Sequence, residues 1–102
     1  MRDSPWGPVD SMEEVAHGVE FVSTPGHGGY HLNEERQAEV VKRFPHFTTF
    51  VGGPWYEEDC DWAIVCFVFP HLFPPEAYQH ALNVARTLAK EGGKWAEVIA
   101  TI

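Results

Sequence analysis

Alternation of apolar and polar residues predicts a β-hairpin early in the chain. Residues 19–24 (VEFVST) alternate and are rich in β-branched side chains, which is typical of a strand. Residues 25–29 (PGHGG) contain one proline and three glycines, so they predict a turn. Residues 30–32 (YHL) are expected to return antiparallel to the first strand, because the connection between them is short.

Two helices are predicted from apolar residues spaced three and four positions apart. Residues 34–44 carry such a stripe after Asn33, which suits a helix N-cap, and Pro45 ends the helix. Residues 75–90 carry the clearest stripe in the chain, with a proline at the first helical position.

The two ends of the chain have weaker patterns. Residues 1–10 are rich in turn formers and are expected to be irregular, and Ser11 is expected to cap a short helical turn that Gly18 ends. Residues 94–102 (KWAEVIATI) are interpreted as a closing strand, and residues 46–51 (HFTTFV) as another short strand.

The apolar run over residues 62–69 (WAIVCFVF) fits both a buried strand and a buried helix. A helix over residues 57–69 is favoured, because its acidic start would lie where the helix dipole stabilises negative charge. The expected fold is therefore α+β, with a small, mainly antiparallel sheet and two or three helices packed on it.

Length and composition fit one domain over residues 1–102, large enough to bury its own core. No apolar run reaches the roughly 18–20 residues that span a bilayer, and the first residues lack the apolar region of a signal peptide. We therefore expect a cytosolic protein without a membrane partner, in which Cys60 and Cys66 are thiols.

Acidic residues dominate the charge. The net charge is −8, and no lysine or arginine lies between Arg43 and Arg86. Such a surface repels phosphates, so direct nucleic-acid binding is not expected. It attracts basic protein surfaces, including those that bind nucleic acid, although acidic charge also simply maintains solubility.

The segment GGPWYEEDCDW (residues 52–62) combines this charge with aromatic side chains. Tyrosine and tryptophan are enriched in binding hot spots, and adjacent acids would add charge. The candidate partner-binding residues are Trp55, Tyr56, Glu57, Glu58, Asp59 and Asp61. The alternatives are that the acids cap a helix and that Trp55 and Trp62 pack in the core, with Trp6 the more exposed tryptophan.

An enzyme is the alternative from a different class, as a Cys/His or metal-assisted hydrolase that uses His27, His31 and Cys60. Zinc accepts nitrogen, sulfur and oxygen ligands, and a cysteine at a helix N-terminus has a lowered pKa. However, CxxC and HExxH signatures are missing, and the glycine-rich turn lacks the lysine of a phosphate-binding loop. Neither a metal nor another cofactor is therefore expected.

Two segments, VSTPGHGGYHL and GGPWYEEDCDWAIV followed by FP, resemble the two signature blocks of an uncharacterised domain family of phages, prophages and plasmids. That family sometimes occurs inside larger antirestriction-like proteins. The resemblance implies no catalytic residue, because no chemistry is established for the family. The signature positions that it implies are His27, Gly28, Gly29, Tyr30, Trp55, Tyr56, Glu57, Glu58, Asp59, Cys60, Asp61 and Trp62.

Charge pattern and resemblance together give the expected function. The chain is expected to be a small acidic protein of a phage or other mobile element that inhibits a host defence protein of the CRISPR or restriction type. It would act in the host cytosol by competing at a basic nucleic-acid-binding surface of a nuclease or surveillance complex. A structural domain that forms a homodimer through its aromatic residues is a third option.

Overall fold

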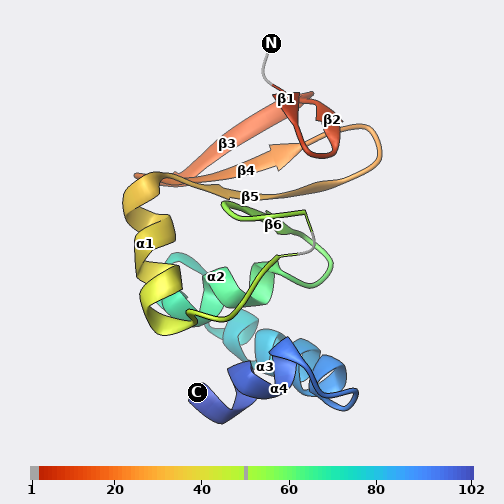
Figure 1. Cartoon of the computed structure of the whole chain (residues 1–102). Helices are drawn as coiled ribbons and strands as arrows, with labels where there is room; N and C mark the ends of the chain where they lie inside the picture. Colours follow the sequence, from red (N-terminus) through yellow and green to blue (C-terminus); the bar gives the residue numbers. More distant parts are fainter. Residues whose placement is uncertain (1–2, 50) are drawn as a thin grey trace.

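The computed structural model describes residues 3–49 and 51–102, and within them a sheet lies at one end and the helices at the other (Figure 1). A four-stranded antiparallel sheet has the order β3-β4-β5-β6, and a short two-stranded hairpin, β1-β2, precedes it. The strands are β1 Asp3–Ser4, β2 Gly7–Pro8, β3 Ser11–Ala16, β4 Val19–Ser23, β5 Gly28–Leu32 and β6 Trp55–Glu57.

This described part of the chain also has four α-helices and one 3-10 turn, with α1 between β5 and β6 and the others after β6, which confirms the predicted α+β class. They are α1 Glu34–Arg43, α2 Trp62–Val68, η1 Pro70–Leu72, α3 Pro75–Ala89 and α4 Lys94–Thr101. The predictions for α1 and α3 are confirmed. At the start of α1, the Asn33 side-chain oxygen accepts a hydrogen bond from the Arg36 backbone N–H at 2.9 Å, as expected of an N-cap.

The hairpin β4-β5 also forms as predicted, but Gly28 and Gly29 belong to β5 and not to the turn. Their lack of a side chain is needed for close packing. A Cβ atom at Gly29 would lie 2.3 Å from the Tyr56 carbonyl oxygen and 2.6 Å from the Trp6 ring. Only glycine lets β6 and Trp6 approach β5 this closely.

The helical turn predicted after Ser11 is wrong, because residues 11–16 form β3. This strand pairs antiparallel with β4 through a two-residue turn in which Gly18 has a φ of +83°. A glycine with positive φ at such a turn is typical of a tight hairpin. The hydrogen bonds to β4 therefore outweigh the capping signal of Ser11.

The strands predicted over residues 46–51 and 94–102 are also wrong. Residues 46–49 and 51 have no strand partner, and residue 50 lies outside the described residues. The C-terminal segment is α4, whose Trp95 and Val98 are buried. These two residues are three apart, which is a helical spacing that the sequence already contained. The tail forms a helix because this spacing puts both side chains on the face that packs against α3.

The helix predicted over residues 57–69 is shorter than expected, since α2 begins at Trp62. Glu57 ends β6, and the Glu58 backbone N–H donates to the Gly28 carbonyl at 3.0 Å. The acids therefore extend strand pairing and form a turn, and they do not occupy the first turn of a helix. Pairing of β6 with β5 fixes this arrangement.

Helix α2 is the centre of the core. It lies between the sheet and α3 (Figure 1) and contacts α1 as well. Five successive side chains are at most 1% exposed: Ala63, Ile64, Val65, Cys66 and Phe67. One face of the sheet packs towards this helix through Val19, Leu32 and Tyr56, so the opposite face, here called the outer face, points away from the helices.

The close approach at Gly29 predicts a specific stability loss. Gly29→Ala should destabilise the fold by about 1–3 kcal/mol, because the Tyr56 backbone cannot move aside as a flexible side chain could. Urea denaturation followed by circular dichroism measures this loss. Gly26→Ala, in the turn before β5, is the matched control, because an added Cβ there meets nothing within 4 Å. Equal stability of the two variants would contradict the packing described.

Candidate functional site

A row of polar and aromatic side chains crosses the outer face of the sheet. Glu14 on β3 pairs with Glu20 on β4, Glu20 pairs with His31 on β5, and His31 pairs with Trp55 on β6. Because paired residues of antiparallel strands share a face, these four side chains lie side by side. We call them, together with Glu57 two positions beyond Trp55, the acid–aromatic face.

Aromatic contacts hold this face together. The His31 Nδ1 atom lies 3.2 Å from a Glu20 carboxylate oxygen, and the His31 ring lies 4.4 Å from the Trp55 ring. Trp6 then meets Trp55 edge-to-face at 5.7 Å between ring centroids. The β1-β2 hairpin brings Trp6 onto Gly29 and Trp55, so Trp6 is half-buried, as Trp55 and Trp62 are. The Nε1 atom of Trp6 is buried without a hydrogen-bond partner in the described part of the chain.

An acidic turn continues from the face. It consists of Glu57, Glu58 and Asp59, of which the last two are exposed and Glu57 is half-buried. Burial raises the pKa of Glu57, and the negative charges of Asp59 and Asp61 raise it further, while His27 acts in the opposite direction. The turn thus concentrates like charges whose mutual repulsion is not fully compensated within the chain.

Two of the six predicted partner-binding residues point inwards. Tyr56 is 1% exposed, and its hydroxyl donates to the Gln37 side-chain oxygen at 2.5 Å. Burial raises the pKa of Tyr56 to about 12. Asp61 is 2% exposed. The surface that a partner can touch therefore reduces to Trp55, Glu57, Glu58 and Asp59 within the predicted set.

Sequence reasoning missed Glu14, Glu20, His31 and Trp6 as neighbours of this surface. The available signal was the alternation in VEFV and GYHL, which puts Glu20 and His31 on the side opposite to Val19 and Leu32. The contribution of Trp6 had no local signal, because it depends on where the β1-β2 hairpin folds back.

The hydrolase alternative has little geometric support. His31 lies on the outer face, whereas Cys60 packs against the core and lines a shallow hollow with His80 and Leu88 of α3. These two residues are therefore on opposite sides of the sheet. Within residues 3–49 and 51–102, no group of three His, Cys, Asp or Glu side chains is arranged to hold a metal ion.

Cys60 also differs from the reactive thiolate that the sequence suggested. Burial raises its pKa, and the charges of Asp61, Glu57 and Asp59 raise it further, with only a weaker opposing effect of Lys94. The expected lowering by a helix N-terminus is wrong, because burial of the sulfur and the negative charges of the nearby acids both act in the opposite direction. Cys60 is therefore a protonated thiol at neutral pH.

Comparison with known proteins identifies the family. A family model described as a domain of unknown function, DUF7007, matches residues 1–101, so the chain belongs to this family. Neither the curated proteins nor the solved structures compared with the chain give a match. The described helices include none that is both long and apolar enough to cross a membrane. Membership gives a family for the whole chain but assigns no activity to it.

Thiol chemistry provides a test of the site. Cys60 should react with iodoacetamide near neutral pH more slowly than free cysteine, whose pKa is about 8.5, because its own pKa is raised. Cys66, buried and with a pKa of about 11, should react only after unfolding. Mass spectrometry over time measures both rates, and Cys60→Ser removes the faster one. A Cys60 rate above that of free cysteine would revive the hydrolase alternative.

The raised pKa of Glu57 predicts a pH-dependent stability. Protonation of Glu57 is more favourable in the folded chain than in the unfolded one, so the folded state loses stability as pH rises through this pKa. Glu57→Gln should therefore gain up to about 0.5 kcal/mol at pH 7, a typical size for a surface change. The gain should vanish near pH 4.

Denaturant midpoints measured across this pH range test the expectation. Glu91→Gln, an exposed site outside the acidic turn, serves as the charge-matched control and should show no such gain. A Glu57→Gln chain that is less stable than the native chain at pH 7 would show that the carboxylate makes a favourable contact instead.

Proposed function

We propose that this DUF7007 chain is a protein-binding protein that docks its acid–aromatic face and acidic turn on a basic surface of a partner. One observation carries the proposal. The four-stranded sheet and the turn after it contain no lysine or arginine, while acids lie on three of the strands and throughout the turn.

All lysines and arginines of the described residues lie in the helical part. Helix α1 carries Arg36, Lys42 and Arg43, α3 carries Arg86, Lys90 follows α3 directly, and Lys94 begins α4. The molecule therefore has an acidic end and a mixed end. Such a field orients a basic partner towards the sheet during encounter and accelerates association at low salt.

The packing of Trp55 also supports the proposal. It is half-buried, held between the rings of His31 and Trp6, and flanked by Glu57. A rigid aromatic side chain beside carboxylates can pack on the stem of a lysine or arginine while the acids meet its charge. Burial and the charges of Asp59 and Asp61 raise the pKa of Glu57, and a cation of the partner would offset the repulsion between these carboxylates.

The partner class follows from chemistry and resemblance. Basic protein surfaces that an acidic chain can occupy include those that bind the phosphates of nucleic acid. The resemblance of the two signature blocks to a family of phages, prophages and plasmids adds host defence as the setting. We therefore propose inhibition of a host restriction nuclease or CRISPR surveillance complex by competition with nucleic acid.

Protection of DNA from cleavage tests this function. A panel of restriction nucleases and CRISPR effector complexes is assayed with the purified chain, and inhibition of a susceptible enzyme should weaken as salt increases. In the triple variant Glu57→Gln, Glu58→Gln, Asp59→Asn, the concentration needed for half-maximal inhibition should rise about tenfold or more, because charge complementarity at the interface is lost. Trp55→Ala should weaken inhibition at every salt concentration.

The matched control changes three exposed acids of the helical end to glutamine: Glu76 on α3, Glu91 in the turn after α3 and Glu97 on α4. It changes the net charge equally and should retain inhibition. Loss of inhibition in this control alone would place the interface on the helical end. Full activity of the triple variant of the turn would reject the acid–aromatic face, and protection from none of the enzymes would reject the host-defence setting.

A further inference from the structure

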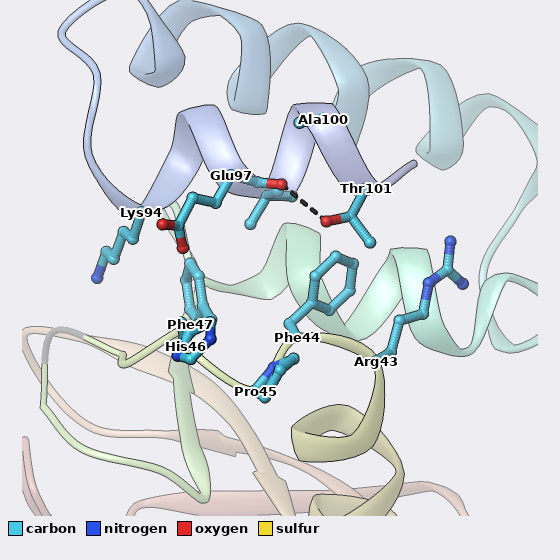
Figure 2. A pocket seen from close by; sticks show the side chains of 10 residues that line it. Arg43, Phe44, Pro45, His46, Phe47, Lys94, Glu97, Ala100 and Thr101 are labelled. Atoms are coloured by element: carbon cyan, nitrogen blue, oxygen red, sulfur yellow. Dashed lines mark hydrogen bonds between the residues drawn. The ribbon is translucent and has the colours of Figure 1, made fainter.

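A groove beside α4 has an apolar floor with cations at its ends (Figure 2). Helix α4 lies at the end of the molecule away from the sheet (Figure 1). The groove has a volume of about 330 Å³ and lies between one side of α4 and the segment that follows α1. This volume is within the range of small-molecule sites, roughly 300–1,000 Å³.

The floor of the groove is apolar and fixed in place. Phe44 is 4% exposed and Val98 is 1% exposed, so both belong to the core and show only an edge to the groove. Phe47 completes the floor, and its ring packs edge-to-face on Trp95 at 5.1 Å. A ligand with an apolar body would therefore meet a preformed surface and would not have to order it.

Cations stand at the two ends of this floor, with Arg43 at one end and Lys94 at the other (Figure 2). Arg43 donates through Nη1 to the Phe67 carbonyl at 3.0 Å. Lys94 donates through Nζ to the Thr48 carbonyl at 2.5 Å and lies 4.7 Å from the centre of the Phe47 ring. Each side chain is thus positioned by one hydrogen bond and keeps further N–H donors for a ligand.

The charged residues that line the groove indicate which polar group a ligand would carry. Glu97 is the carboxylate among the residues that line the groove, and Figure 2 shows it near Phe47 on the side of Lys94. The Arg43 end has no acid among the lining residues. A guanidinium binds a carboxylate through two parallel hydrogen bonds, so this end suits an organic anion.

We infer that the groove binds a small amphipathic carboxylate, with its aromatic or aliphatic body on Phe44, Phe47 and Val98 and its carboxylate on Arg43. This site is independent of the proposed inhibitory function and lies on different elements. A peptide segment or a second copy of the chain is the competing occupant, and the experiment below separates these cases.

Titration followed by backbone NMR shifts tests the inference with three matched probes: 3-phenylpropionate, 3-phenylpropanol and 3-phenylpropylamine. The carboxylate should give saturable shifts confined to the segment 43–47 and to α4. The dissociation constants of the alcohol and the amine should be at least about tenfold higher than that of the carboxylate, because these probes lack the charge-assisted hydrogen bonds to Arg43. Equal affinity of the carboxylate and the alcohol, or no saturable shift, would overturn the inference.

Two variants locate the site. Arg43→Gln should reduce carboxylate affinity about tenfold and leave alcohol affinity unchanged, whereas Arg86→Gln, the charge-matched control on α3, should change neither. Because Arg43 also bonds to α2, Thr101→Trp provides a second readout. Thr101 is exposed at the end of α4 and points to the groove (Figure 2), so the indole should fill the groove and abolish binding.

Retention of affinity in Thr101→Trp would overturn the assignment of the groove. Shifts at the same residues that grow with protein concentration in the absence of any probe would show that a second copy occupies the groove, and this result would also overturn the inference.

Discussion

Complete burial of α2 is the constraint on which the rest of the structure depends. A helix that is apolar on every side must be covered on every side, and this chain covers it with one face of the sheet, with α1 and with the apolar stripe of α3. One face of the sheet therefore packs towards the helices. The outer face carries the buried Val22 together with Glu20, His31 and Trp55, whose side chains come together across three strands. The candidate site is thus a consequence of how the core is closed.

The same closure separates the charges. The helices carry the lysines and arginines of the described residues, whereas the sheet and the turn after β6 carry acids without a cation. The acidic turn is held by strand pairing, since the Glu58 backbone is bonded to Gly28. Burial raises the pKa of Glu57, and the negative charges of Asp59 and Asp61 raise it further. Groups with perturbed pKa values cluster at functional sites, which is why this turn is included in the proposed binding surface.

The two proposed surfaces differ in the kind of ligand because they differ in shape and charge. The acid–aromatic face lies on a sheet and suits the broad surface of a protein with basic side chains. The groove beside α4 is concave, has an apolar floor and places Arg43 at one end, so it suits a small organic anion. Membership of the DUF7007 family covers the chain from residue 1 to residue 101 and therefore includes both surfaces, without favouring either.

The sequence by itself determined the elements with complete local signals. Asn33 and Pro45 delimit α1, the stripe after Pro75 defines α3, and alternation defines β4 and its return strand. It also determined that acids and aromatic residues are adjacent between residues 55 and 61. The tertiary structure decided the conformation of segments whose local propensities do not favour one element. Residues 11–16 pair with β4, and the tail forms a helix against α3. The acids end strand β6 and form the turn after it. The tertiary structure also decided that Tyr56 and Asp61 point inwards while Trp6 folds onto Gly29. The physical reason is that strand pairing and burial depend on residues distant in the chain, and their free energy exceeds the small differences in local preference.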